Sequence, residues 1–148
     1  MRRVSYLVGL LLVLMIAGCG GGNNTPTNVG LFGDWNIVMY PNGNPNPSYV
    51  FAMAISQEGT NNYSGSAIAY TGGVPVPSDE CIDTAALRAS GVTSGTNFTL
   101  TFTDPTTSTV ITVQGSLSTQ TTTLSGTYTN PASQSCSASS GTMTMTPQ

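Results

Sequence analysis

The sequence contains no histidine and no lysine, and its three arginines are Arg2, Arg3 and Arg88. Without histidine, the chain cannot form the Ser–His or Cys–His pairs that commonly activate a nucleophile, and without lysine it cannot form a Schiff base. The most common nitrogen ligand of zinc is missing for the same reason. These absences predict a protein that is not an enzyme, carries no cofactor and has no metal site.

Charge is scarce as well, because only 6% of the residues are charged. The acidic side chains outnumber the basic ones, and they are Asp34, Glu58, Asp79, Glu80, Asp83 and Asp104. A surface of this kind does not attract phosphate groups, so nucleic acid and anionic lipid headgroups are poor partners. Solubility has to come from threonine, serine, asparagine and glutamine instead.

Three of these acids, Asp79, Glu80 and Asp83, flank Cys81. Clustered carboxylates are ligands that Ca²⁺ accepts, so the segment is a candidate for a weak calcium site. The alternative is a solvated acidic loop held by a disulfide, and this is the interpretation that we favour.

The N-terminal segment begins with Arg2 and Arg3 and continues as an apolar run over residues 4–17. A charged start followed by a short apolar run is typical of an export signal. The run of about 14 residues is shorter than the roughly 20 that a membrane-spanning helix needs. We therefore predict a cleaved leader and not a permanent membrane helix.

The motif Ile16-Ala17-Gly18-Cys19 closes this run and resembles the lipobox of bacterial lipoproteins. The resemblance implies that Cys19 receives a diacylglyceryl group and, after cleavage of the leader, a further acyl chain. Two or more acyl chains give stable membrane attachment. Because Gly20 replaces the aspartate that favours retention in the inner membrane, the resemblance also implies the outer membrane of the cell envelope.

Removal of residues 1–18 as a signal peptide would leave about 130 residues, which is enough for one domain with a modest core. Residues 19–30 comprise the lipidated cysteine and a stretch rich in glycine and asparagine, which we expect to be a flexible tether. A single domain is expected over residues 31–148.

Two cysteines, Cys81 and Cys136, remain once Cys19 is assigned to the anchor. In an exported protein such a pair favours a disulfide. A link that closes about 55 residues would stabilise the fold by roughly 4 kcal/mol in the chain-entropy model.

Hydrophobic and polar residues alternate along most of the domain, and turn residues divide it into eight runs. The predicted strands cover residues 31–40, 48–57, 63–70, 85–93, 97–103, 109–117, 123–129 and 141–146. The fourth is the weakest, because residues 84–88 also fit a short helical turn capped by Asp83 or Thr84. The inward face of the third is ambiguous, and Gly115 in the sixth suits a β-bulge.

Eight short antiparallel strands would leave two exposed edges unless the sheet closes or folds on itself. We therefore predict an all-β fold, a small antiparallel eight-stranded meander barrel, with a β-sandwich as the alternative. The outward positions are rich in threonine, which suits exposed strand positions. They argue against a barrel that spans a membrane, whose outside must be apolar.

Gly33-Asp34-Trp35, at the start of the first predicted strand, resembles the Gly-x-Trp motif of the calycins, which are lipocalin and avidin-like barrels. The resemblance implies an eight-stranded barrel with the tryptophan packed across one end. It concerns the topology and implies no particular ligand.

The aromatic side chains on the inward faces are candidates for an apolar ligand pocket, and Arg88 is a candidate contact for an anionic ligand or partner. The aromatic candidates are Trp35, Tyr49, Phe51, Phe98, Phe102 and Tyr128. The same side chains also suit the filled core that a domain of this size needs, and Arg88 also suits an ion pair with a nearby acid.

These observations predict an envelope lipoprotein whose domain is a non-enzymatic binding module. It would bind a small apolar ligand inside the barrel or a protein partner through its loops. The alternative is a structural or inhibitory envelope protein with a solid core and no ligand.

Overall fold

The computed structural model describes residues 30–70, 81–117, 122–133 and 136–148. These residues form eight strands: β1 (Gly33–Pro41), β2 (Tyr49–Gln57), β3 (Asn62–Ile68), β4 (Arg88–Ser94), β5 (Asn97–Thr103), β6 (Val110–Ser116), β7 (Leu124–Asn130) and β8 (Ser139–Pro147). The predicted signal peptide, Cys19 and all of the predicted tether except Gly30 lie outside the described residues.

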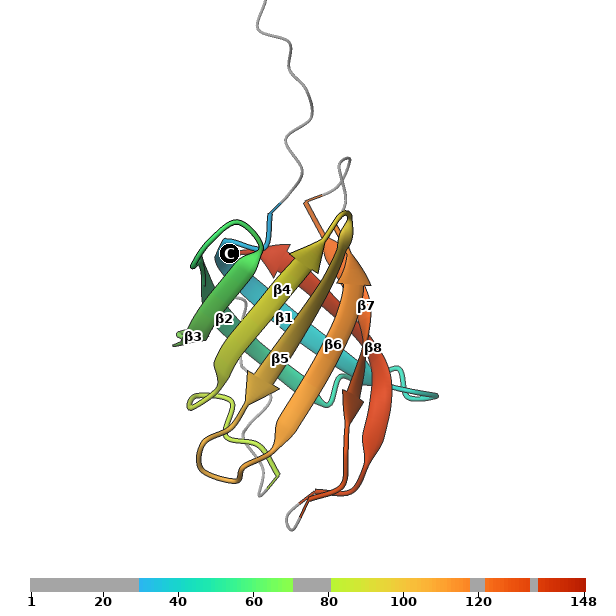
Figure 1. Cartoon of the computed structure of the whole chain (residues 1–148). Coiled ribbons are helices and arrows are strands. Elements are labelled where there is room, and N and C mark those ends of the chain that lie inside the picture. The colour runs from blue at the N-terminus through green and yellow to red at the C-terminus, as the bar shows by residue number, and fades with distance from the viewer. Residues whose placement is uncertain (1–29, 71–80, 118–121, 134–135) are drawn as a thin grey trace, which may run out of the picture.

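The eight strands form a closed meander barrel, as predicted (Figure 1). Each strand pairs antiparallel with the next in sequence, and β8 returns to pair with β1 from Trp35↔Pro147 to Pro41↔Gly141. The β-sandwich alternative is therefore wrong, because every edge of the sheet is paired. No helix in the described part of the chain is long and apolar enough to cross a bilayer.

Alternation along each strand decides which side chains enter the barrel. In β5, the inward residues Phe98, Leu100 and Phe102 are at most 2% exposed, whereas the threonines between them are half-buried. The ambiguous strand β3 turns Tyr63 inward, because Tyr63 is 8% exposed and belongs to the core cluster while its neighbour Asn62 is exposed. Antiparallel sheets commonly pack one face on the core and expose the other to solvent.

Two hairpins contain glycines at positive φ. Gly43, with φ of 77°, lies in the connection from β1 to β2, and Gly95, with φ of 60°, turns β4 into β5. A positive φ favours glycine, because glycine has no Cβ atom to clash with the backbone. The predicted turns at these two places are therefore confirmed.

The segment before β4 combines the two alternatives that the sequence left open. Residues 84–86 form a turn, and the strand begins only at Arg88. The Asp83 side chain accepts a hydrogen bond from the Ala85 N–H at 3.0 Å, and the Asp83 carbonyl accepts one from the Ala86 N–H at 3.1 Å. Asp83 therefore organises the turn, as proposed for a cap, but no helix follows.

The bulge predicted at Gly115 is wrong. Gly115 pairs with Phe98 on one side and Gly126 on the other, in a register that continues unbroken along both strand pairs. A Cβ atom at Gly115 would lie 2.5 Å from Cζ of Phe98 and 2.4 Å from the Ser125 carbonyl oxygen. The glycine is there because the phenyl ring occupies the space that a side chain would need.

The strands are staggered around the barrel. Following the pairing from Gly33 once around the sheet returns to β1 near Gly43, about ten residues further along. Such a stagger tilts the strands relative to the barrel axis. An eight-stranded barrel has an interior that side chains can just fill.

Candidate functional site

The six aromatic candidates meet inside the barrel, as the sequence predicted. They are exposed by 0–7% of their surface: Trp35 3%, Tyr49 7%, Phe51 2%, Phe98 2%, Phe102 0% and Tyr128 1%. The rings of Phe51 and Phe102 pack edge to face, with centroids 5.5 Å apart and planes at 84°. Aromatic pairs prefer this geometry because the positive ring edge meets the negative face. The six side chains are therefore part of one packed cluster.

Trp35 lies near the end of the barrel at which β1 begins. Its indole N–H donates a hydrogen bond to the Leu31 carbonyl oxygen at 2.8 Å, and Leu31 is fully buried. The bond satisfies the only polar atom of the side chain, so the ring can remain in the core. We call this end, which is at the top of Figure 1, the upper end.

Small residues on the inward faces make room for large neighbours. A Cβ atom at Gly91 would lie 2.5 Å from Cδ2 of Leu100, and one at Gly141 would lie 2.9 Å from Cε1 of Tyr128. Pairing small with large residues is how a narrow barrel is filled to the density of a protein interior.

Two inward side chains of β7, Tyr128 and Asn130, have a buried polar atom without a hydrogen-bond partner. The Tyr128 hydroxyl oxygen is buried and makes no hydrogen bond. An unsatisfied buried hydroxyl costs roughly 1–3 kcal/mol. Either atom favours a polar partner inside the barrel, because the partner would recover this cost.

The lower end of the barrel is closed by a hydrogen-bonded cluster around Asp104, which is fully buried. Its carboxylate accepts bonds from the Asp83 N–H at 2.7 Å, the Thr106 N–H at 2.7 Å and the Thr107 hydroxyl at 2.9 Å. Burial raises the pKa of Asp104, but these hydrogen bonds outweigh it and hold the pKa below the ordinary value of 3.8. The Asp104 carboxylate therefore stays ionised at neutral pH. Its hydrogen bonds hold the connection before β4 against the loop between β5 and β6.

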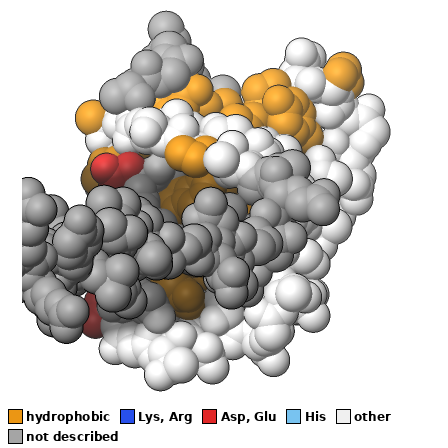
Figure 2. All heavy atoms as spheres, turned by 90° about the horizontal axis from the view of Figure 1, so that it is seen from above, with side chains coloured by type: hydrophobic (Ala, Val, Ile, Leu, Met, Phe, Trp, Pro, Cys, Tyr) orange, Lys and Arg blue, Asp and Glu red, His pale blue; other side chains and the backbone are white. Residues whose placement is uncertain are grey.

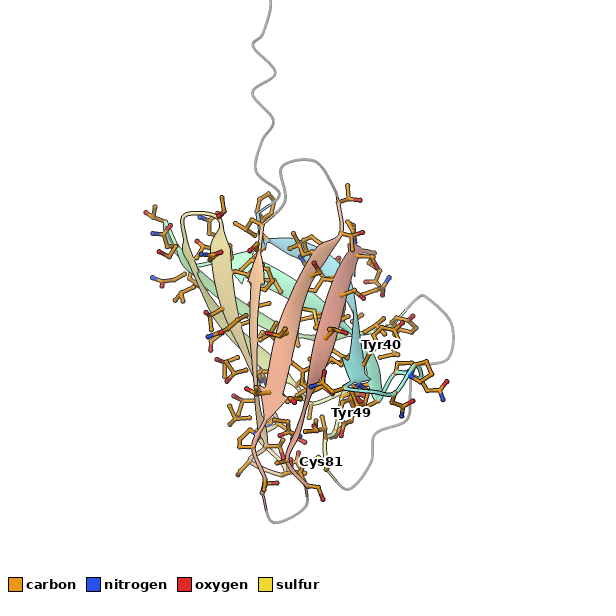
Figure 3. The ribbon with its side chains drawn as sticks, turned by 90° about the vertical axis from the view of Figure 1, so that its right-hand side faces the viewer. Tyr40, Tyr49 and Cys81 are labelled. Atoms are coloured by element: carbon orange, nitrogen blue, oxygen red, sulfur yellow. A yellow bond between two sulfur atoms is a disulfide. The ribbon has the colours of Figure 1, made fainter. Side chains whose placement is uncertain are left out.

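The predicted disulfide between Cys81 and Cys136 is present and belongs to the same end (Figure 3). The two Cα atoms are 4.8 Å apart. The Thr109 hydroxyl donates a hydrogen bond to the Cys81 carbonyl oxygen at 3.0 Å. Ile82, the residue after Cys81, is fully buried. The disulfide thus holds the connection before β4 against the one between β7 and β8.

Arg88 stands apart from the aromatic cluster. It is exposed at the first position of β4, and its cross-strand neighbours are Ser66 and Thr103. Asp79 and Glu80 of the acidic segment lie outside the described residues, so the predicted choice between a calcium site and a solvated loop stays open. In the described part, no group of three or more potential metal-ligating side chains comes together.

The outside of β5, β6, β7 and β8 is uncharged. The outward residues are Asn97, Thr99, Thr101, Thr103, Val110, Thr112, Gln114, Ser116, Ser125, Thr127, Thr129, Ser140, Thr142, Thr144 and Thr146. The sequence predicted the threonines on this face but gave no sign that the face is hollowed.

Two depressions hollow this face over β6, β7 and β8. A lower one of about 730 Å³ is lined by Thr112, Thr129 and Ser140. An upper one of about 410 Å³ is lined by Gln114 and Thr127, among others. Thr129 and Thr127 are two positions apart on β7, so the depressions adjoin, and we call them together the outer groove.

The upper end carries exposed apolar side chains around its rim, as the end-on view in Figure 2 shows. Phe32, which directly precedes β1, is 62% exposed, and Val92 near the end of β4 is 51% exposed. Isolated apolar residues on a surface are ordinary.

Comparison with known proteins gives no further assignment: no protein-family model, curated protein or solved structure matches the chain. The barrel fits a calycin-like topology, and the chemistry of its surface has to be argued from its own residues.

Proposed function

We propose that the protein is a lipid-anchored, non-enzymatic binding module of the bacterial cell envelope, and that it meets its partner with the outside of the barrel. The observation that carries this proposal is the packing of the interior. The six inward aromatic side chains are buried in one core cluster, so a ligand bound among them would have to displace packed side chains.

The anchor is proposed from the leader and from Cys19. The described part of the chain begins just before β1, at the upper end of the barrel (Figure 1). A lipid on Cys19 would therefore keep the upper end towards the membrane. The sides of the barrel and its disulfide-linked lower end would then be accessible to partners in the envelope.

A small ligand inside the barrel is the second candidate function. It is favoured by the buried Tyr128 hydroxyl and the buried Asn130 side-chain oxygen, neither of which has a hydrogen-bond partner. A ligand that supplied one hydrogen-bonding atom at either point would recover the cost of the unsatisfied group.

Native mass spectrometry of the protein extracted from its source membrane separates the two candidates. We expect the mass of the acylated chain beginning at Cys19, with no small molecule retained in the gas phase. A small molecule bound in stoichiometric amount and released on denaturation would contradict binding by the outer surface alone and favour the second candidate.

The anchor has its own test in Cys19→Ser, because serine provides no thioether for the lipid. We expect the variant to leave the membrane fraction, while Gly22→Ser in the tether remains membrane-bound as the control. Membrane retention of Cys19→Ser would refute the lipid anchor.

A further inference from the structure

We propose that the outer groove binds a neutral glycan chain. This inference rests on the proposed function, since it names the surface and the chemical class of the partner that such a binding module would meet. It is carried by the shape of the groove, by the hydrogen-bonding groups in it and by the absence of charge around it.

The groove is long enough for several sugar units. Its lower depression extends from the Pro41–Asn42 corner to Pro131, and its upper depression reaches Ser116 and Thr144. Cross-strand pairs form adjoining rows across it, Thr112↔Thr129 in one row and Gln114↔Thr127 in the next. Successive outward residues on one strand are about 7 Å apart, which places polar groups at intervals shorter than two sugar rings.

The groups in these rows suit sugar hydroxyls. A threonine or serine hydroxyl both donates and accepts, and the amides of Asn42 and Gln114 offer a donor and an acceptor side by side. A sugar also carries hydroxyls that donate and accept. The glycan can therefore form hydrogen bonds with the groove in many positions along it. Such neutral hydrogen bonds are individually weak, and we expect dissociation constants in the high-micromolar to millimolar range.

The groove is poorly suited to other classes of partner. No basic residue lies among the outward positions of β5, β6, β7 and β8, so an anionic polymer finds no counter-charge there. Protein interfaces concentrate their binding energy in tryptophan, tyrosine and arginine and are poor in serine and threonine at their centre. The face is therefore complementary to an uncharged, hydroxyl-rich chain.

An aromatic residue lies on β1, the strand next to β8, in register with the upper depression. Tyr40 points outward from β1, is half-buried and pairs with Thr142 of β8 (Figure 3). An aromatic side chain combines an apolar face with a polar tip, so Tyr40 can cover the apolar face of a sugar ring. This places one stacking surface next to the hydroxyl rows.

The test uses the mature lipoprotein in micelles of a zwitterionic detergent, because a detergent with a sugar headgroup would compete. The probes are the hexasaccharides of β-1,4-glucose, α-1,4-glucose and β-1,4-N-acetylglucosamine, with polygalacturonate as the anionic comparison. Binding is followed by isothermal titration calorimetry and by ¹⁵N–¹H chemical shifts. We expect at least one neutral hexasaccharide to bind, with shifts confined to β6, β7 and β8 and little dependence on salt.

Three matched variants locate the site. Thr129→Val and Thr142→Val remove one hydroxyl each from the lower and the upper depression, and we expect each to weaken binding about three- to tenfold. Thr146→Val, on the same face of β8 but outside both depressions, should leave binding unchanged. Valine keeps the branched shape that exposed strands favour, so the variants should fold.

The glycan inference is overturned if no neutral hexasaccharide binds at millimolar concentration, if only polygalacturonate binds, or if all three variants weaken binding equally. These outcomes are distinct from failure of the proposed function. If Cys19→Ser leaves the membrane fraction and the native protein holds no interior ligand, the proposed function stands even when no hexasaccharide binds.

Discussion

At the scale of single residues, Asp104 shows how a charge can be buried without a cation. Three hydrogen-bond donors within 3 Å replace the water that the carboxylate loses on folding. Hydrogen bonds to charged groups are stronger than those between neutral groups, so this arrangement stabilises the ionised form in particular. The stability of the lower end therefore depends on pH.

Asp104→Asn should lower the free energy of unfolding at neutral pH by about 2–4 kcal/mol, because the amide nitrogen cannot accept the bonds that the carboxylate oxygen accepts. Since the pKa of Asp104 is lowered by folding, its contribution is present above the ordinary carboxyl range and is lost as the pH falls through the folded pKa. Urea unfolding between about pH 7 and pH 2 measures both effects.

The exposed Asp34→Asn serves as the control for this prediction and should change stability by less than about 0.5 kcal/mol at neutral pH. If Asp104→Asn loses stability on acidification as steeply as the unchanged protein does, another acid is responsible for the pH dependence.

Tyr128→Phe tests the other unusual residue. Because the hydroxyl is buried without a partner, its removal should raise the free energy of unfolding by about 1 kcal/mol in the ligand-free protein. Thermal and urea unfolding measure the change. A loss of more than about 1 kcal/mol would contradict the structure, since it would mean that the hydroxyl has a partner.

At the scale of elements, the glycines of the barrel strands are explained by their neighbours across the sheet. Gly115 in β6 faces Phe98 in β5, and its pairing with Gly126 in β7 brings the Ser125 carbonyl close. The sequence shows that a glycine interrupts an apolar face, which suggests a bulge. Only the packing of adjacent strands shows that the gap is filled by a ring.

Gly115→Ala should therefore destabilise the protein by about 1–3 kcal/mol, because a Cβ atom overlaps both a ring and a backbone oxygen. Gly59→Ala, where the nearest atom to a Cβ is 4.0 Å away, is the matched control and should change stability by less than about 0.5 kcal/mol. Equal effects from the two substitutions, measured by urea unfolding, would contradict this account of Gly115.

A second feature of the elements is that β2 is apolar on both faces. Val50 and Ala52 point outward, yet they are only 8% and 1% exposed. Gln148, which follows β8, donates a hydrogen bond to the Ala69 carbonyl oxygen at 2.8 Å, although β1 and β2 separate β8 from β3 in the sheet. Ala69, just after β3, is thus held close to the C-terminal residue across the edge formed by β1 and β2.

At the scale of the whole molecule, closure between β1 and β8 and the disulfide both constrain distant parts of the chain. The disulfide links residues 55 positions apart, and the pairing of β8 with β1 links the two ends of the domain. Because antiparallel closure pairs every strand on both sides, we expect the barrel to form without the disulfide, at lower stability.

The double variant Cys81→Ala, Cys136→Ala should lower the free energy of unfolding by roughly 2–4 kcal/mol, because the unfolded chain regains the freedom that the link removes. Its far-ultraviolet circular dichroism should remain that of the barrel below the unfolding transition. Unchanged stability under oxidising conditions would show that the disulfide does not form in the protein.

The sequence by itself determined the strands and most of their inward faces, because alternation of apolar and polar residues is a local pattern that the pleat converts directly into an inside and an outside. The inward face of β3, where small residues occupy both faces, was settled only by the burial of Tyr63. It also determined the pairing of Cys81 with Cys136, since these are the two cysteines left in the domain. Residues 84–88 were ambiguous because a turn and a strand start share the same short stretch.

The tertiary structure alone decided between a closed barrel and a sandwich. It alone showed that the aromatic side chains pack into one core cluster and that the outside of β6, β7 and β8 is hollow. These properties depend on the stagger between strands and on which side chains face one another across it. Both are distances between residues far apart in the chain, and a local pattern contains no information about them.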